Sequence, residues 1–149
     1  MRKWSTEINI QAPIEEVWEL LNGTLEDMQK IMPQVIENTP IKETDDIVGS
    51  IYRQKYKEGK RIQEYEVETL EYHDTPDNKR LKVGFSLANM FEITALYELK
   101  KLDEDNLLFT YTATNRALKW FVKLFLIFAS DKIVVQFAER VKRVAESQV

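Results

Sequence analysis

Tyrosine and glutamine residues recur at every second position along residues 52–56 and 63–65, and Val67 and Thr69 continue the second row. In a β-strand this spacing places side chains on one face. Such a face combines apolar ring area with a few directional hydrogen-bonding groups, which is typical of a pocket that orients a largely apolar ligand. A core whose tyrosine hydroxyls reach its rim would show the same pattern, so the residues alone leave both interpretations open. The predicted ligand-binding residues are Tyr52, Gln54, Tyr56, Gln63, Tyr65, Tyr97, Tyr111, Leu124 and Phe128.

The single histidine, His73, is the first candidate for acid–base chemistry. Imidazole titrates near neutral pH, and the following residue, Asp74, could tune it. Adjacent residues of a strand point to opposite faces, however, so a direct relay between His73 and Asp74 would need a turn. We therefore expect an exposed histidine near a strand end, and we assign no catalytic residue.

The sequence carries no recognisable metal or cofactor motif. One histidine and no cysteine leave no ligand cluster at a metal-binding spacing. A phosphate-binding loop, a dinucleotide glycine fingerprint and a nucleophile elbow are also absent. Glu64, Glu66 and Glu68 alternate along a strand, which is typical of a solvated face. We therefore expect no metal and no cofactor.

Composition argues against several classes of protein. A formal net charge of −4 and a pI near 5.2 disfavour a protein held to nucleic acid by bulk electrostatics. The absence of cysteine removes disulfides, and the N-terminal residues lack the apolar core of a secretory signal, so we expect a cytoplasmic protein. The longest apolar stretch, residues 117–129, contains two lysines and is shorter than the ~20 residues of a spanning helix. Membrane contact is therefore expected to be transient at most.

The elements that must position these residues begin with a strand and two short helices. Alternating apolar residues predict a strand over residues 4–10, and helical spacing predicts a helix over 14–21 that Pro13 starts. Asn22 and Gly23 are a typical helix stop. Thr24 then caps a second short helix.

Six further strands follow, separated by short polar turns that favour antiparallel pairing of consecutive strands. Their predicted bounds are 35–43, 49–57, 61–73, 79–87, 91–101 and 106–114. On the side opposite the tyrosine row, Arg53 and Lys55 would lie across from Glu64 and Glu66 and could form cross-strand charge pairs. The pattern predicts a curved sheet with one solvated face.

The C-terminal region, residues 117–146, has helical propensity throughout, but its apolar stripe changes side. The first half carries Ala117, Phe121, Leu124, Phe125 and Phe128, and the second half carries Val134, Phe137, Val141, Val144 and Ala145. Because the two sets fall on nearly opposite sides of a straight helix, we predict a kink or a new helix start at Ser130 or Asp131.

The first half of that region is apolar almost all round, between Trp120 and Phe128. One sheet face cannot bury such a helix completely, so apolar surface is left for a cavity lip, a homodimer partner or a lipid interface. Two lysines give weak attraction to anionic lipid, and we therefore favour a cavity lip with self-association.

The pattern Ile8-x-Ile10-x-Ala12-Pro13-x-x-x-Val17-Trp18-x-x-Leu21, followed by Met32-Pro33, resembles the opening of the START-related, Bet v 1-like (SRPBCC) superfamily. The likeness is strongest to its bacterial polyketide cyclase/dehydrase and lipid-transport branch, and it extends through the order of elements over nearly the whole chain. It implies an α+β helix-grip fold: a curved antiparallel sheet of about seven strands, two short helices after the first strand, and a long, kinked C-terminal helix over a cavity.

The resemblance implies a mostly apolar cavity that holds lipids, sterols, polyketides, plant hormones or quinones. Residues 1–146 would form the single domain, with 147–149 as a loose tail. We expect binding, sequestration or transfer of a hydrophobic small molecule. A cyclase- or dehydratase-like enzyme that moves protons with a tyrosine or His73 is the alternative, as is a protein-interaction module using the apolar surface at residues 120–128. The matching motif is structural, so no catalytic set can be carried over.

Overall fold

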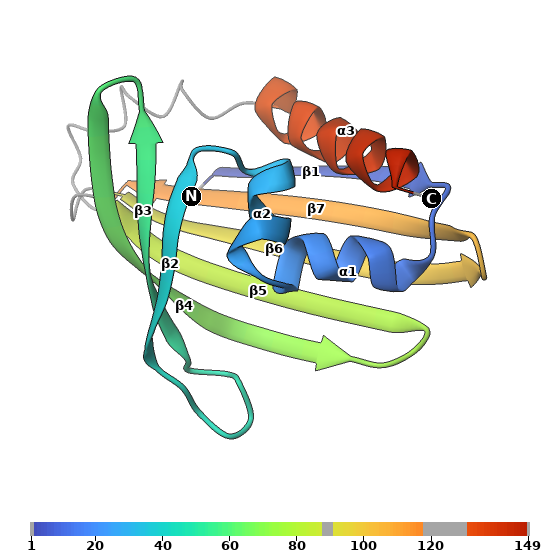
Figure 1. The fold of residues 1–149 in the computed structure, drawn as a ribbon, viewed down its shortest axis with the longest axis horizontal. Coiled ribbons are helices and arrows are strands. Elements are labelled where there is room, and N and C mark those ends of the chain that lie inside the picture. Colours follow the sequence, from blue (N-terminus) through green and yellow to red (C-terminus); the bar gives the residue numbers. More distant parts are fainter. Residues whose placement is uncertain (1, 88–90, 118–130, 149) are drawn as a thin grey trace.

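The computed structural model describes residues 2–87, 91–117 and 131–148 of the chain. Its strands are β1 (Arg2–Ile10), β2 (Val35–Lys42), β3 (Ile51–Glu58), β4 (Arg61–Asp74), β5 (Asn78–Leu87), β6 (Phe91–Asp103) and β7 (Asn106–Ala117), and its helices are α1 (Ile14–Asn22), α2 (Leu25–Ile31) and α3 (Asp131–Ser147). The strands form one curved sheet, and these helices lie on one of its faces (Figure 1). The α+β helix-grip architecture predicted from the sequence is confirmed.

The sheet is antiparallel throughout and has the strand order β1-β7-β6-β5-β4-β3-β2. Each strand from β2 to β7 pairs with its sequence neighbour, and β1 pairs with β7, so β1 and β2 are the two edges. Gln54 on β3 lies opposite Tyr65 on β4, and Tyr97 on β6 lies opposite Tyr111 on β7. The pairing therefore gathers the tyrosine and glutamine row from distant parts of the sequence onto one face.

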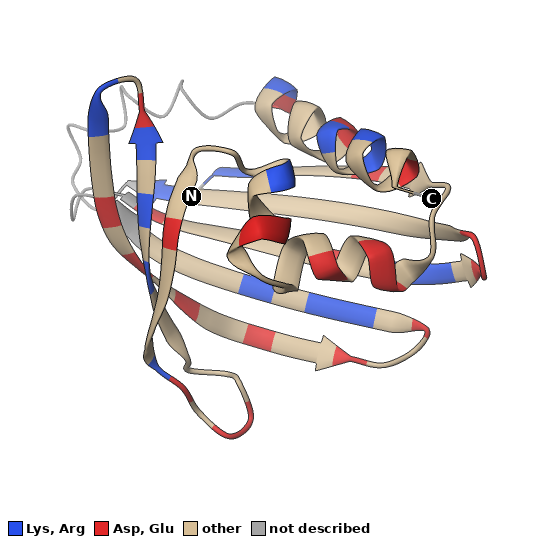
Figure 2. Ribbon diagram, viewed as in Figure 1, with Lys and Arg blue, Asp and Glu red and all other residues tan. Residues whose placement is uncertain are grey.

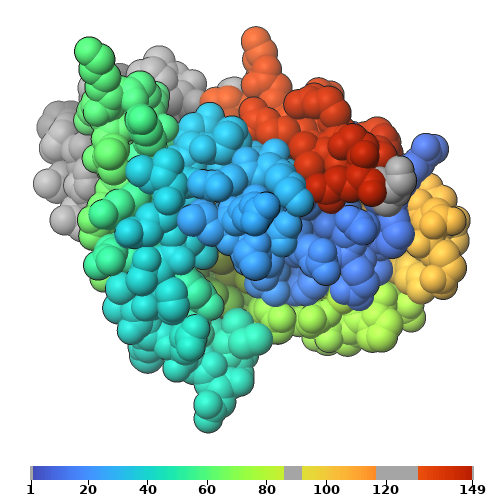
Figure 3. Space-filling view, viewed as in Figure 1, coloured from blue at the N-terminus to red at the C-terminus, as the bar shows by residue number. Residues whose placement is uncertain are grey.

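The helices cover the concave face of the sheet. α1, α2 and α3 lie side by side over it (Figure 3). Between α1, α3 and the sheet lies a core that includes the fully buried side chains of Ile10, Val17, Phe109 and Val141. Burial of this apolar area makes the largest contribution to holding the helices on the sheet.

The opposite, outer face of the sheet is charged, as predicted. Lys and Arg positions on β5 lie beside Asp and Glu positions on β4 (Figure 2). Arg53 Nε lies 3.7 Å from Glu64 Oε1, and Arg80 Nε lies 2.9 Å from Glu71 Oε1. Ion pairs this exposed contribute only about 0–1 kcal/mol each to the free energy of unfolding, so their main effect is to keep this face hydrated.

The junction between α1 and α2 depends on Gly23 and Thr24. The Thr24 hydroxyl accepts a hydrogen bond from the Asp27 amide at 3.2 Å, which confirms the predicted cap. Gly23 ends α1 with a negative φ of −92°, so its role is not the left-handed conformation. A Cβ at Gly23 would meet the Glu19 carbonyl oxygen at 2.3 Å, and the close approach of the backbone is therefore what requires glycine there.

Several element ends differ from the sequence prediction by one to three residues, and two of these differences bear on how the elements are positioned. Pro13 occupies the N-cap position with an extended ψ of 143°, one residue before the first helical turn. β7 extends to Ala117, where helix was predicted, because Ala117 pairs with Phe91 of β6 and Asn115 pairs with Arg2 of β1. Strand pairing with β6 overrides the local helix propensity of Ala117.

The described part of α3 runs from Asp131 to Ser147, one residue beyond the expected end of the domain. The predicted break at Ser130 or Asp131 involves residues outside the described part of the chain. Its buried residues Val134, Val141 and Ala145 belong to the apolar set predicted for the second half of the helix. The predictions made for Leu124, Phe128 and the apolar surface at residues 120–128 fall outside the described residues.

Candidate ligand cavity

A cavity of about 290 Å³ lies between the concave face of the sheet and the helices α2 and α3. Its size is close to the lower end of ordinary small-molecule sites. The cavity is lined by Leu21, Met28, Met32, Gln34, Val35, Gln54, Tyr56, Tyr65, Val67, Leu81, Val83, Phe85, Ile93, Thr94, Ala95, Tyr97, Tyr111, Phe137 and Arg140. Apolar and aromatic side chains predominate, as in sites that enclose a largely apolar ligand.

Stacked aromatic rings form part of the cavity wall. Tyr97 and Tyr111 have ring centroids 5.4 Å apart and nearly parallel planes, and Phe137 of α3 closes over Tyr111 at 4.8 Å. Tyr65 stacks on Phe85 at 4.9 Å. These contacts hold the rings in fixed orientations, so their hydroxyl groups are positioned before any ligand arrives.

The hydroxyl groups of Tyr65, Tyr97 and Tyr111 form no hydrogen bond within the described part of the chain. Burial raises the pKa of both Tyr65 and Tyr111 to about 12, and it raises the pKa of Tyr97 well above the ordinary value. Phenols with such pKa values stay protonated at neutral pH. They can therefore donate hydrogen bonds to an oxygen of a ligand, but they do not act as bases.

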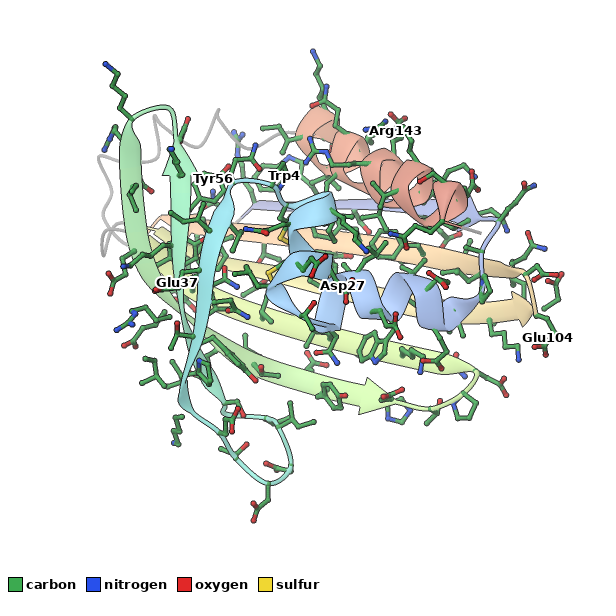
Figure 4. All side chains as sticks on the ribbon, viewed as in Figure 1. Trp4, Asp27, Glu37, Tyr56, Glu104 and Arg143 are labelled. Atoms are coloured by element: carbon green, nitrogen blue, oxygen red, sulfur yellow. The ribbon has the colours of Figure 1, made fainter. Side chains whose placement is uncertain are left out.

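One margin of the cavity is polar. Arg140 of α3 donates a hydrogen bond from Nη1 to the Ile31 carbonyl oxygen at the end of α2, at 3.3 Å. Tyr56 on β3 lies opposite Val35, so Gln34 and Tyr56 meet at the same margin. Burial is the main cause that raises the pKa of Tyr56, the Glu58 carboxylate adds to the rise, and the charge of Arg140 opposes it. Tyr56 lies on the side of β3 that faces the helices (Figure 4).

Five of the predicted binding residues line this cavity, namely Gln54, Tyr56, Tyr65, Tyr97 and Tyr111. Tyr52 and Gln63 share their face of the sheet by register but are not among the lining residues. Gln54 is partly engaged, because its amide nitrogen donates to Asn38 Oδ1 at 3.2 Å. The residues of the predicted row therefore share the face of the sheet that bears the cavity, but the cavity extends over only part of that row.

His73 lies away from the cavity. It is exposed on the outer face of the sheet, opposite Arg80, while Asp74 pairs with Lys79. The expected opposite orientation of His73 and Asp74 rules out a relay between them. Within the described residues, no group of three or more His, Asp or Glu side chains is placed to hold a metal ion.

Two grooves on the outer face, about 400 Å³ each, exceed the cavity in volume. One is lined by Glu66, Glu68 and Glu92, and the other by charged residues including Arg80 and Glu98. Both grooves are lined by several charged side chains, so they lack the predominantly apolar lining that is usual for small-molecule sites. We therefore take the concave cavity as the candidate site.

Sequence reasoning missed Arg140, Phe137 as a lining residue, and Asn115. Asn115 lies on β7 on the same face as Tyr111, by strand alternation, and is 9% exposed. Its Oδ1 is buried and has no hydrogen-bond partner in the described structure. In the sequence, Asn115 is a polar residue at a position that would face inward if the strand continued. The predicted strand ended at residue 114, so Asn115 was not considered part of it.

A sequence profile for the family described as "polyketide cyclase / dehydrase and lipid transport" matches residues 1–146. The chain belongs to this family. Among the described residues, no helix is long and apolar enough to span a membrane. Among curated proteins, no sequence matches this member of the family significantly.

Solved structures with the same fold share little sequence with this family member. Norcoclaurine synthase from Thalictrum flavum, solved with dopamine and hydroxybenzaldehyde, has a TM-score of 0.68 at 13% identity, covering 99% of this chain and 88% of that one. The major latex-like protein 151 from Panax ginseng gives 0.66 at 19% identity, covering 99% and 96%. The di-domain ARO/CYC protein BexL from the BE-7585A biosynthetic pathway gives 0.76 at 14% identity, covering 98% of this chain but only 47% of BexL. At these identities the likeness establishes the fold alone.

Proposed function

We propose that the protein binds a hydrophobic small molecule in the cavity between its sheet and α3, for sequestration or transfer. The observation that supports this most strongly is the lining itself, which is largely apolar yet presents the hydroxyls of Tyr65, Tyr97 and Tyr111, which have no hydrogen-bond partner among the described residues. An ordinary core would fill this space with side chains, because protein interiors leave few voids larger than a water molecule. Family membership agrees with a ligand of lipid, isoprenoid or polyketide type.

The lining residues would contribute to binding in two different ways. Met28, Val83 and Phe85 offer apolar area, which supplies the non-directional part of the binding free energy. The tyrosine hydroxyls supply direction, because each can donate to one oxygen of the ligand. Phe137 and Arg140 of α3 close the cavity opposite the sheet, so α3 controls how much of the ligand is enclosed.

The test is a titration with the neutral apolar dye phenylnaphthylamine, whose fluorescence rises when it leaves water. Wild-type protein should bind the dye, whereas Val83→Phe, which adds a ring to the cavity wall, should weaken binding by about tenfold or more. Leu96→Phe adds a ring on the opposite face of the next strand and serves as the control. Equal dye binding by all three proteins would place the dye outside the cavity and contradict the proposal.

A cyclase-like enzyme is the second candidate, and the protonated phenols of Tyr65 and Tyr111 favour it specifically. Buried donors with pKa values of about 12 can stabilise a developing enolate oxygen without being consumed as acids. The enclosed wall would also hold a reactive chain in one folded geometry. The two functions separate in one experiment: a compound extracted from the protein and returned to ligand-free protein is released unchanged by a carrier and altered by an enzyme.

A further inference from the structure

Arg140 is the only charged side chain among the described residues that line the cavity. It lies half-buried on α3 beside apolar neighbours such as Phe137, in a protein whose net charge is −4. A guanidinium group placed against apolar surface loses part of its hydration, and this cost is normally offset by a carboxylate or phosphate partner.

No ion pair joins Arg140 to a carboxylate of the described residues; its hydrogen bond to the Ile31 carbonyl uses one of five N–H donors. That bond explains how α3 is fixed to the end of α2, but it leaves the charge uncompensated. Gln34 and the Tyr56 hydroxyl lie at the same margin of the cavity and add further hydrogen-bonding groups. The margin is therefore suited to an anionic group, while the apolar wall beyond it suits the rest of a ligand.

From this geometry we infer that the ligand is an amphipathic acid: an apolar body enclosed by the tyrosine-lined wall, ending in a carboxylate or phosphate that pairs with Arg140. This inference rests on the proposed function and specifies its ligand class. Arg140 would set specificity, since neutral compounds of the same shape would leave the guanidinium unpaired. Pairing of Arg with a carboxylate or phosphate is frequently bidentate, which would also fix the direction of the ligand in the cavity.

The test compares ligands of one chain length that differ only in the polar end: decanoate, decyl phosphate, decanol and decylamine. Isothermal titration of wild-type protein should show decanoate or decyl phosphate binding at least about tenfold more tightly than decanol, with decylamine the weakest. Whichever acid binds more tightly identifies the anionic group that Arg140 accommodates. Decanol binding as tightly as both acids would overturn the inference while leaving the proposed function intact. If none of the four binds, the proposed function fails as well.

Three variants of α3 test whether Arg140 causes the preference for acids. Arg140→Met should reduce the preference for the acids over decanol to about twofold or less, because it keeps the apolar stem and removes the charge. Arg143→Met removes the same charge from the same helix, at an exposed position on the side of α3 away from α1 and α2 (Figure 4), and should leave the preference unchanged. Arg140→Lys keeps a charge if the methionine variant is too unstable to measure, and it should retain part of the preference. Equal losses in Arg140→Met and Arg143→Met would contradict a specific pairing.

Discussion

The tyrosine hydroxyls of the cavity make the folded protein sensitive to high pH. Burial raises the pKa of Tyr65 and Tyr111 from 10.0 to about 12, so the unfolded chain releases these protons before the folded protein does. The associated stability is fully present below pH 10 and is lost as the pH rises towards 12. Urea denaturation across this range should therefore show a falling free energy of unfolding.

The double variant Tyr65→Phe/Tyr111→Phe removes both titrating groups. Its free energy of unfolding should fall less steeply between these pH values than that of the wild type. An equally steep fall in the variant would mean that other groups cause the loss, and that the two phenols are not held in the protonated form.

Asn115 Oδ1 is buried and has no hydrogen-bond partner in the part of the chain that the structure describes, and an unsatisfied buried acceptor costs stability. Asn115→Val should raise the free energy of unfolding by about 1 kcal/mol, because it removes an unsatisfied buried oxygen. Thr112→Val on the same strand is the matched control: the Thr112 hydroxyl hydrogen-bonds to Ser5 at 3.0 Å, so its loss should cost about 1 kcal/mol. Destabilisation by both variants, measured in urea, would show that Asn115 has a stabilising partner.

For individual residues, the sequence could predict which face of a strand each side chain lies on, because this depends on local periodicity. Gln54, Tyr56 and Tyr65 line the cavity because alternation in a strand fixes the face of each side chain. Arg140 could not be found in this way, because its position is set by contact with Ile31, far away in the sequence. Likewise, Tyr52 does not line the cavity. The extent of the cavity depends on the curvature of the sheet and on which part of it the helices cover, and a local sequence pattern cannot predict either.

At the scale of elements, Lys79 attaches α1 to the sheet. Its side chain is 2% exposed, contacts Asp74, and lies 2.9 Å from Glu15 on α1. The ammonium group also lies over the Trp18 ring, 5.5 Å from its centroid. Burial alone would lower the pKa of Lys79, but the hydrogen bonds to Asp74 and Glu15 outweigh this and raise it above the ordinary value.

This arrangement predicts that removing the charge of Lys79 destabilises the fold less than removing the charges of its two carboxylate partners. Lys79→Met should cost about 1 kcal/mol or less, because Glu15 and Asp74 remain partly exposed and hydrated. The double variant Glu15→Gln/Asp74→Asn leaves the buried ammonium group unpaired and should cost about 3 kcal/mol or more. Urea denaturation of both variants measures the difference, and a larger loss in Lys79→Met would contradict it.

The order of the elements was predictable, because the turns between strands are short and polar and each strand alternates clearly. The end of β7 was not. The sequence predicted a strand that ends at residue 114 and a helix that begins at Ala117, yet β7 pairs with β6 as far as Ala117 and with β1 as far as Asn115. Strand pairing is a long-range interaction, so propensity within a window cannot determine where such a strand ends.

At the scale of the whole molecule, the fold separates two surfaces of opposite character. The outer face of the sheet carries ion pairs such as Arg80 with Glu71, and the concave face carries the mostly apolar cavity. The helices α2 and α3 complete this cavity, so the site exists only in the folded chain. A ligand that binds there should therefore stabilise the fold by mass action.

Native mass spectrometry of the purified protein, before and after incubation with decanoate, tests the central claim most directly. The account predicts a species that carries one small molecule per chain in the wild type, and a strong reduction of that species in Val83→Phe. Denaturing extraction of the protein as isolated would then give the chemical class of any natural ligand. A wild-type protein that carries nothing in either state, or a Val83→Phe variant that carries as much as the wild type, would contradict ligand binding in this cavity.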